Sequence, residues 1–70
     1  SEEAISYFNK AIKIKPDFHK AWFTLGTAYE VDNNLDSAII KYEKAIELNP
    51  GYTKAYSNLG NIRLIRKVSD

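Results

Sequence analysis

The segment from Ala21 to Glu30, with the sequence AWFTLGTAYE, holds the only tryptophan of the chain and has a glycine near its centre. Trp22, Leu25 and Tyr29 recur at three- and four-residue spacing, which is typical of one face of a helix. A glycine inside a helix costs about 0.5–1 kcal/mol relative to alanine. Gly26 therefore needs a reason in packing, because local helix propensity argues against it.

An internal repeat supplies that reason. Gly60 follows Gly26 at the same offset at which Pro50 follows Pro16. This repeat offset, a period of about 34 residues, is typical of stacked helical repeats, and it indicates that the glycine position lets a neighbouring helix come close. The same offset pairs Ala4 with Ala38, Ile5 with Ile39, Phe8 with Tyr42, Lys10 with Lys44, Ala11 with Ala45, Ile12 with Ile46, Lys20 with Lys54, Ala21 with Ala55, Trp22 with Tyr56 and Leu25 with Leu59.

Composition excludes several classes of protein. The chain has 70 residues, no cysteine and one histidine, so disulfides, thiolate metal sites and histidine clusters are not expected. A net charge of +1 gives no general attraction to nucleic acid or acidic membranes. No apolar run approaches the roughly 18–20 residues of a membrane span. We expect a protein without cofactor or metal, with no nucleic-acid or membrane partner, in an intracellular location.

Apolar residues at helical spacing predict four helices separated by short polar or proline-containing turns. Pro16 ends the first helix, and Asp17 is the expected N-cap of the second. Asp36 or Ser37 is the expected N-cap of the third. The predicted helices span about residues 1–15, 17–30, 37–48 and 52–67.

The residues of the repeat carry a family resemblance. The pattern Trp22-x-x-Leu25-Gly26-x-x-Tyr29 resembles the tetratricopeptide repeat, and the small, aromatic and proline positions that follow at the same family spacing are Ala38, Tyr42, Ala45 and Pro50. The resemblance implies an all-α fold of antiparallel helical hairpins stacked as a right-handed superhelix. It covers the whole chain as one array segment in the helix order B-A-B-A: residues 1–18 a helix B half-repeat, 19–52 a full repeat and 53–70 a helix A half-repeat. Arg63 departs from the family, which prefers tyrosine there.

Catalytic chemistry finds no support in the sequence. His19 is the only histidine and is expected on the surface, in the first turn of a helix. No nucleophile elbow and no glycine-rich phosphate loop occur. Arg63, Arg66 and Lys67 are too few to form a nucleic-acid-binding stripe. The sequence therefore predicts that the protein is not an enzyme.

The resemblance implies binding of a protein or peptide in a concave groove lined by the A helices. Asn58 is the most suggestive position, because an amide offers both donors and an acceptor to a peptide backbone. Its surroundings, AYSNLGN (55–61), are similar to repeats of O-linked N-acetylglucosamine transferase, where groove asparagines bind peptide backbone. The residues implied to face the groove are Lys20, Phe23, Thr24, Thr27, Glu30, Lys54, Ser57, Asn58 and Asn61.

Two alternatives stay open for these residues. The carboxylate clamp, by which some family members grip chaperone C-termini, is disfavoured because both positions that need its lysine hold Phe23 and Ser57. The other alternative is that the groove residues bind nothing and are simply polar positions exposed to solvent.

A second functional hypothesis concerns the two end helices, which are apolar over much of their circumference. Acidic Glu2 and Glu3 stand at one end of the chain, and basic Arg63, Arg66 and Lys67 at the other. A structural unit could therefore associate head to tail with its own copies, although the apolar ends also fit the cut faces of a longer array. The residues predicted for self-association are Ile5, Phe8, Ile12, Leu59, Ile62 and Ile65.

Overall fold

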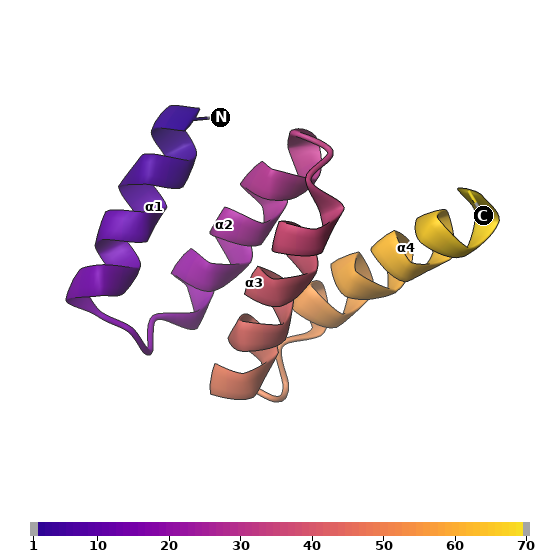
Figure 1. Ribbon diagram of the computed structural model, residues 1–70. Coiled ribbons are helices and arrows are strands. Elements are labelled where there is room, and N and C mark those ends of the chain that lie inside the picture. The colour runs from indigo at the N-terminus through magenta and orange to yellow at the C-terminus, as the bar shows by residue number, and fades with distance from the viewer. Residues whose placement is uncertain (1, 70) are drawn as a thin grey trace.

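The computed structural model of the protein describes residues 2–69, which form four helices and contain no strand (Figure 1). This confirms the predicted all-α fold. The helices are α1 (Glu2–Ile14), α2 (His19–Val31), α3 (Leu35–Leu48) and α4 (Thr53–Ser69).

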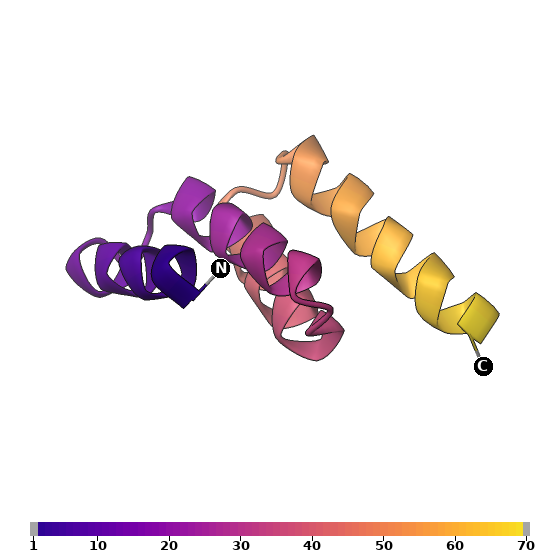
Figure 2. The same ribbon diagram turned by 90° about the horizontal axis from the view of Figure 1, so that it is seen from above.

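Each helix packs against the next one along the chain, and α2 and α3 share the most extensive interface. Short connections make each successive pair antiparallel (Figure 1). Seen from above, α4 runs outward towards its C-terminal end, away from the other three helices (Figure 2). The arrangement is a stack of helical hairpins.

The predicted N-caps are wrong. α2 has Phe18 at its N-cap and α3 has Asn34, and neither side chain makes a capping hydrogen bond. Asp17 stands one residue too early to cap α2. Asp36 already lies in the first turn of α3, where its carboxylate pairs with the Arg66 guanidinium of α4 at 2.8 Å.

The α2–α3 turn has one residue in the left-handed region, Asn33 with φ 62°. Its N–H donates to the Glu30 carbonyl at 2.9 Å, and the Asn34 N–H donates to the Tyr29 carbonyl at 2.9 Å. These bonds satisfy carbonyls at the end of α2. Asparagine tolerates this backbone conformation better than most residues, so the polar turn reverses the chain.

The core lies between α2, α3 and α4, where small and large side chains alternate. Leu25 of α2, Tyr42 of α3 and Ile62 of α4 are its largest fully buried side chains. A Cβ placed on Gly26 would stand 2.6 Å from Cε1 and 2.7 Å from Cδ1 of Tyr42. The expectation that Gly26 serves close packing is thus confirmed. Within residues 2–69, nothing lies within 4 Å of such an atom at Gly60.

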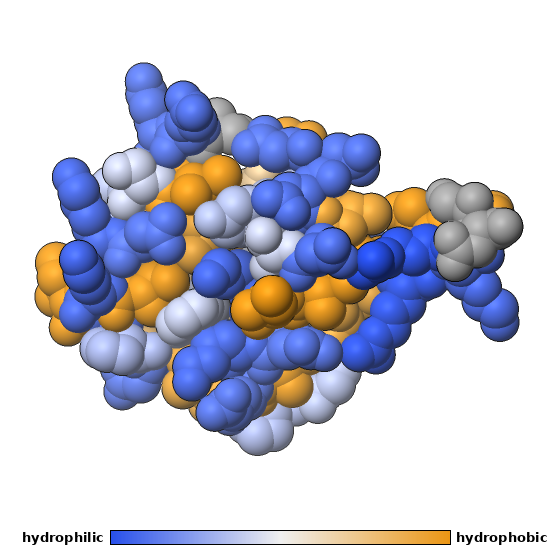
Figure 3. Space-filling view, viewed as in Figure 1, coloured by the Kyte–Doolittle hydropathy of each residue, from blue (hydrophilic) through white to orange (hydrophobic). Residues whose placement is uncertain are grey.

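Several large apolar side chains remain on the surface. Leu64, Ile65 and Val68 of α4 are 60%, 49% and 78% exposed. Apolar atoms are accordingly visible over α4 at the right of the space-filling view (Figure 3). The burial of α4 is one-sided, because Ala55, Leu59 and Ile62 pack inward while these residues do not.

Candidate functional site

The nine residues implied to line a groove come from two helices of the same repeat position, α2 and α4. Three of them, Phe23, Glu30 and Asn58, meet at the side chain of Tyr42. Lys20, Lys54, Ser57 and Asn61 are exposed, whereas Thr24 and Thr27 are half-buried. We call this set of nine residues the α2–α4 face.

The Tyr42 hydroxyl connects three helices. It donates a hydrogen bond to Glu30 Oε1 at 2.6 Å and accepts one from Asn58 Nδ2 at 3.2 Å. Burial raises the pKa of this hydroxyl well above its usual range, and the bond to Glu30 raises the pKa further. The hydroxyl therefore stays protonated and holds the carboxylate of α2 and the amide of α4 in fixed positions.

The Asn58 amide keeps binding capacity after this contact. One of its two N–H groups is used by Tyr42, and residues 2–69 provide no other hydrogen bond to its side chain. Its carbonyl oxygen and second N–H can therefore serve a ligand. Because Asn58 is half-buried, such a ligand would be partly shielded from water.

Phe23 is more deeply engaged than a free groove residue would be. Its ring lies 5.6 Å from the ring of Tyr42 and meets Tyr52 edge-on at 5.2 Å between centroids. Aromatic pairs in these arrangements add about 0.5–1.5 kcal/mol beyond area burial. Phe23 remains half-buried, so it can contribute an apolar edge to the α2–α4 face while it closes the core.

The two threonines of α2 use their hydroxyl protons within the helix. Thr24 donates to the Lys20 carbonyl at 2.9 Å, and Thr27 donates to the Thr24 carbonyl at 2.6 Å. Their oxygens remain acceptors. Thr24 and Thr27 thus offer hydrogen-bond acceptors on α2, and Asn58 and Asn61 offer amide groups on α4.

His19 differs from its expected position on the surface. It is half-buried, because its ring packs edge-on against Tyr52 at 4.9 Å and its Nε2 lies 3.2 Å from the Asn49 amide nitrogen. These contacts fasten the start of α2 to the α3–α4 connection. The residue has a structural role that the sequence pattern did not indicate.

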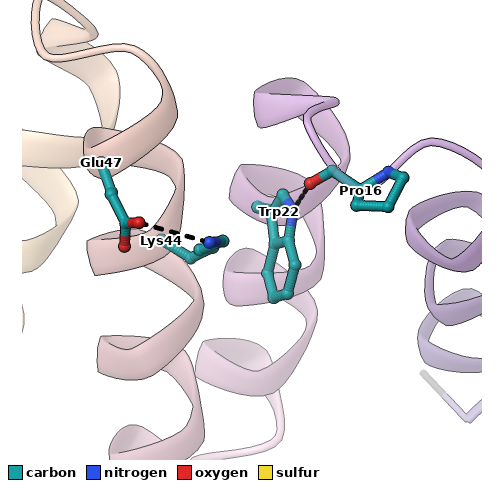
Figure 4. Close-up of polar contacts among 4 residues, drawn as sticks. All are labelled: Pro16, Trp22, Lys44 and Glu47. Carbon is teal, nitrogen blue, oxygen red and sulfur yellow. Dashed lines mark hydrogen bonds and ion pairs between the residues drawn. The ribbon is translucent and has the colours of Figure 1, made fainter.

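A hollow in the surface lies elsewhere, away from the α2–α4 face. It has a volume of about 770 Å³ and is lined mainly by α1, with Trp22 of α2 and Lys41 of α3. Trp22 is held there by a hydrogen bond from Nε1 to the Pro16 carbonyl at 2.9 Å, and Lys44, which also pairs with Glu47, has its ammonium 5.9 Å from the ring centroid (Figure 4). None of the nine residues of the α2–α4 face lines this hollow.

This hollow was not predicted from the sequence. Lys10, which lines it, was noted only as the residue that matches Lys44 at the repeat offset. Trp22 is half-buried, and a lysine ammonium group over a tryptophan ring contributes at least about 0.5–1 kcal/mol. The contacts of Trp22 with Pro16, Lys41 and Lys44 thus give it a role in packing between helices.

These features define a class of protein: stacked helical hairpins whose repeated small and aromatic positions interlock. Three family models described as tetratricopeptide repeat match the chain, at residues 19–52, 41–67 and 1–18. The chain belongs to the tetratricopeptide repeat family. Repeats of this family generally mediate protein–protein interaction and are typically non-catalytic scaffolds.

Comparison with curated proteins finds no match to the chain. None of the helices in residues 2–69 has the combination of length and apolar character that crossing a bilayer requires.

Proposed function

We propose that the chain is a non-catalytic interaction module whose α2–α4 face binds an extended segment of a partner protein. The family supplies the general role, protein–protein interaction. The finer proposal rests on the side chains that α2 and α4 bring to Tyr42.

The observation that carries the proposal is the hydrogen-bonded chain from Glu30 through Tyr42 to Asn58. It orders an amide that still has one donor and one acceptor to offer. A residue in an extended segment also presents one N–H and one C=O, and both point to the same side of the chain. Asn58 can pair with both groups of one such residue, which gives affinity for a backbone without demanding a particular side chain.

Neighbouring residues set the expected chemistry of the partner. Phe23 offers part of an aromatic ring, which suits an apolar side chain. Lys20 and Lys54 are exposed and occupy equivalent positions, one repeat offset apart. These two ammonium groups favour a partner with an acidic residue, by an attraction that added salt will weaken.

A random peptide library displayed on phage and selected on the immobilised chain tests the proposal. We expect selected peptides to lose about tenfold or more in affinity for Asn58→Ala, because a buried peptide group is left unpaired. Asn9→Ala is the matched control, because Asn9 lies on α1, lines the hollow beside Trp22 and is not part of the α2–α4 face. Circular dichroism verifies that both variants are folded.

Peptides that bind Asn58→Ala as tightly as the unaltered chain would contradict the proposal. Peptides lost on Asn9→Ala instead would move the binding site to the hollow beside Trp22.

A further inference from the structure

Two faces of the chain, one on α1 and one on α4, are largely uncovered, although the helices equivalent to them by the repeat offset, α3 and α2, pack against each other. Along α1, Ala4 is exposed and Phe8 and Ala11 are half-buried; along α4, Tyr56 and Leu64 are 51% and 60% exposed. We call Ala4, Phe8 and Ala11 the α1 stripe, and Tyr56, Gly60 and Leu64 the α4 stripe. The equivalents of the α1 stripe, one repeat offset later, are Ala38, Tyr42 and Ala45, each 0% exposed.

The α2–α3 interface is therefore a template for contact between the two stripes. In that interface the Tyr42 ring fills the space beside Gly26, within 2.6 Å of where a Cβ would stand. Gly60 has the same position in α4, and the space beside it is open within residues 2–69. Phe8 is the residue of α1 that corresponds to Tyr42, so its ring matches the open space.

The two polar partners of the template, Tyr42 and Glu30, both correspond to apolar residues in α1 and α4. Tyr42 donates its hydroxyl proton to Glu30 at 2.6 Å. Their equivalents by the repeat offset are Phe8 and Leu64, so the hydroxyl and the carboxylate are both absent. An apolar pair needs no hydrogen-bond partner when it is buried. The two stripes thus match each other in polarity as well as in shape.

The third member of the template follows the same logic. Asn58 donates to the Tyr42 hydroxyl, and its equivalent in α2 is Thr24. Thr24 directs its hydroxyl proton to the Lys20 carbonyl of its own helix. No donor is therefore left that would require a hydroxyl on Phe8.

A cation–aromatic contact of the α2–α3 interface also has its equivalent residues in α1 and α4. Lys44 lies 5.9 Å from the ring centroid of Trp22, and the equivalents of these two residues are Lys10 and Tyr56. The cation–aromatic contact is therefore available again between α1 and α4.

The helix ends are complementary in charge. In an antiparallel pair, the first turn of α1 with Glu2 and Glu3 would meet the last turns of α4, which carry Arg63, Arg66 and Lys67. Arg63 and Arg66 also form ion pairs within the chain, at 3.4 and 2.8 Å, on largely exposed side chains. Such pairs can be shared with a further carboxylate at little cost.

We propose that a second copy of this chain packs its α1 stripe against the α4 stripe of the first copy, with Phe8 seated over Gly60 and against Leu64. The contact joins two different surfaces, so it is head to tail and either closes into a ring or continues as a filament. It uses none of the α2–α4 face and stands independently of the proposed peptide binding.

This register narrows the earlier list of self-association residues. Ile12, Leu59 and Ile62 are 8%, 4% and 0% exposed within one copy, so they already pack inside the chain. Of the six, Phe8 lies at the centre of the proposed contact. Tyr56, Gly60 and Leu64 were not on that list.

Sedimentation velocity of the chain from micromolar to millimolar concentration tests the contact. We expect a mass that rises above the 8.0 kDa of one copy. Gly60→Leu should stay monomeric at every concentration, while its melting temperature in dilute solution does not fall, because the added side chain meets open space in the single copy. Val31→Lys is the control, an exposed apolar residue outside both stripes, and it should associate normally.

A paired substitution tests the register. Leu64→Glu alone should weaken association about tenfold or more, because it buries an unpaired carboxylate. Adding Phe8→Tyr rebuilds the Tyr42–Glu30 pair of the template and should recover most of the lost affinity.

A chain that sediments as a monomer at all concentrations would overturn the proposal and leave the α4 stripe to the next helix of a longer chain. Association of Gly60→Leu equal to that of the unaltered protein would also overturn it. Asn58→Ala should associate normally, which separates this test from that of peptide binding.

Discussion

The two glycines of the repeat provide a matched test of the packing argument. Gly26 and Gly60 occupy the same position of the repeat, and both lie inside helices. A Cβ at Gly26 would stand 2.6, 2.7 and 3.2 Å from three carbon atoms of the Tyr42 ring, whereas at Gly60 it would meet none of the described part of the chain within 4 Å. Alanine at the two positions should therefore change stability in opposite directions.

The magnitudes follow from two opposing effects. Replacing a helical glycine by alanine stabilises a helix by about 0.5–1 kcal/mol, and Gly60→Ala should show that gain. At Gly26 the gain is outweighed by overpacking, which costs about 1–3 kcal/mol. The Tyr42 ring cannot yield easily, because it is fully buried and its hydroxyl is bonded on both sides to Glu30 and Asn58.

Thermal unfolding followed by far-ultraviolet circular dichroism in dilute solution is the appropriate assay. For a domain of this size, 1 kcal/mol corresponds to about 4–8 °C in melting temperature. We expect Gly60→Ala to melt above the unaltered chain, Gly26→Ala below it and Gly26→Leu lower still. Equal shifts in the two alanine variants would refute the packing argument.

Three further substitutions test other parts of the structure. Tyr42→Phe should remove the part of the tyrosinate absorbance that appears only when the protein unfolds at alkaline pH. Folding raises the pKa of the Tyr42 hydroxyl. The stability that this hydroxyl contributes is therefore full below about pH 10, the pKa of an unperturbed tyrosine, and declines as the pH rises beyond it. Asn33→Ala should lower the free energy of unfolding by about 1 kcal/mol because φ is 62° there, while Asn33→Gly should not, as urea titrations can show. Ile62→Ala should cost about 2–5 kcal/mol from a fully buried site, against less than about 0.5 kcal/mol for Ile14→Ala at a residue that is 86% exposed; equal costs in calorimetry would contradict the described core.

The fold could be predicted from the sequence because its period is set by packing. Small residues such as Ala38 and Ala45, the aromatic Tyr42 and the intervening Gly26 are needed wherever two helices interlock, so they recur and are visible in one sequence. Helix caps were not predictable in the same way. Asp36 has the chemistry of a cap, but its carboxylate is taken by Arg66 of a helix distant in sequence.

The candidate site was predictable only in part. The sequence pointed to Asn58 and Glu30 as separate polar positions, and it placed Tyr42 in the core. That one hydroxyl joins them depends on the distance between α2, α3 and α4, which no pattern reveals. The one available signal was that Phe8 replaces Tyr42 at the repeat offset, which marks the hydroxyl as a feature of the central repeat.

The central claim is that the chain recognises a partner segment through the α2–α4 face. The most direct measurement is a nuclear magnetic resonance titration of the isotope-labelled chain with a peptide selected on it, which reports on each backbone and asparagine amide. We expect the largest shifts to fall on Asn58 and on the other residues of the α2–α4 face. Shifts confined to α1, Trp22 and Lys41, around the hollow, would contradict it.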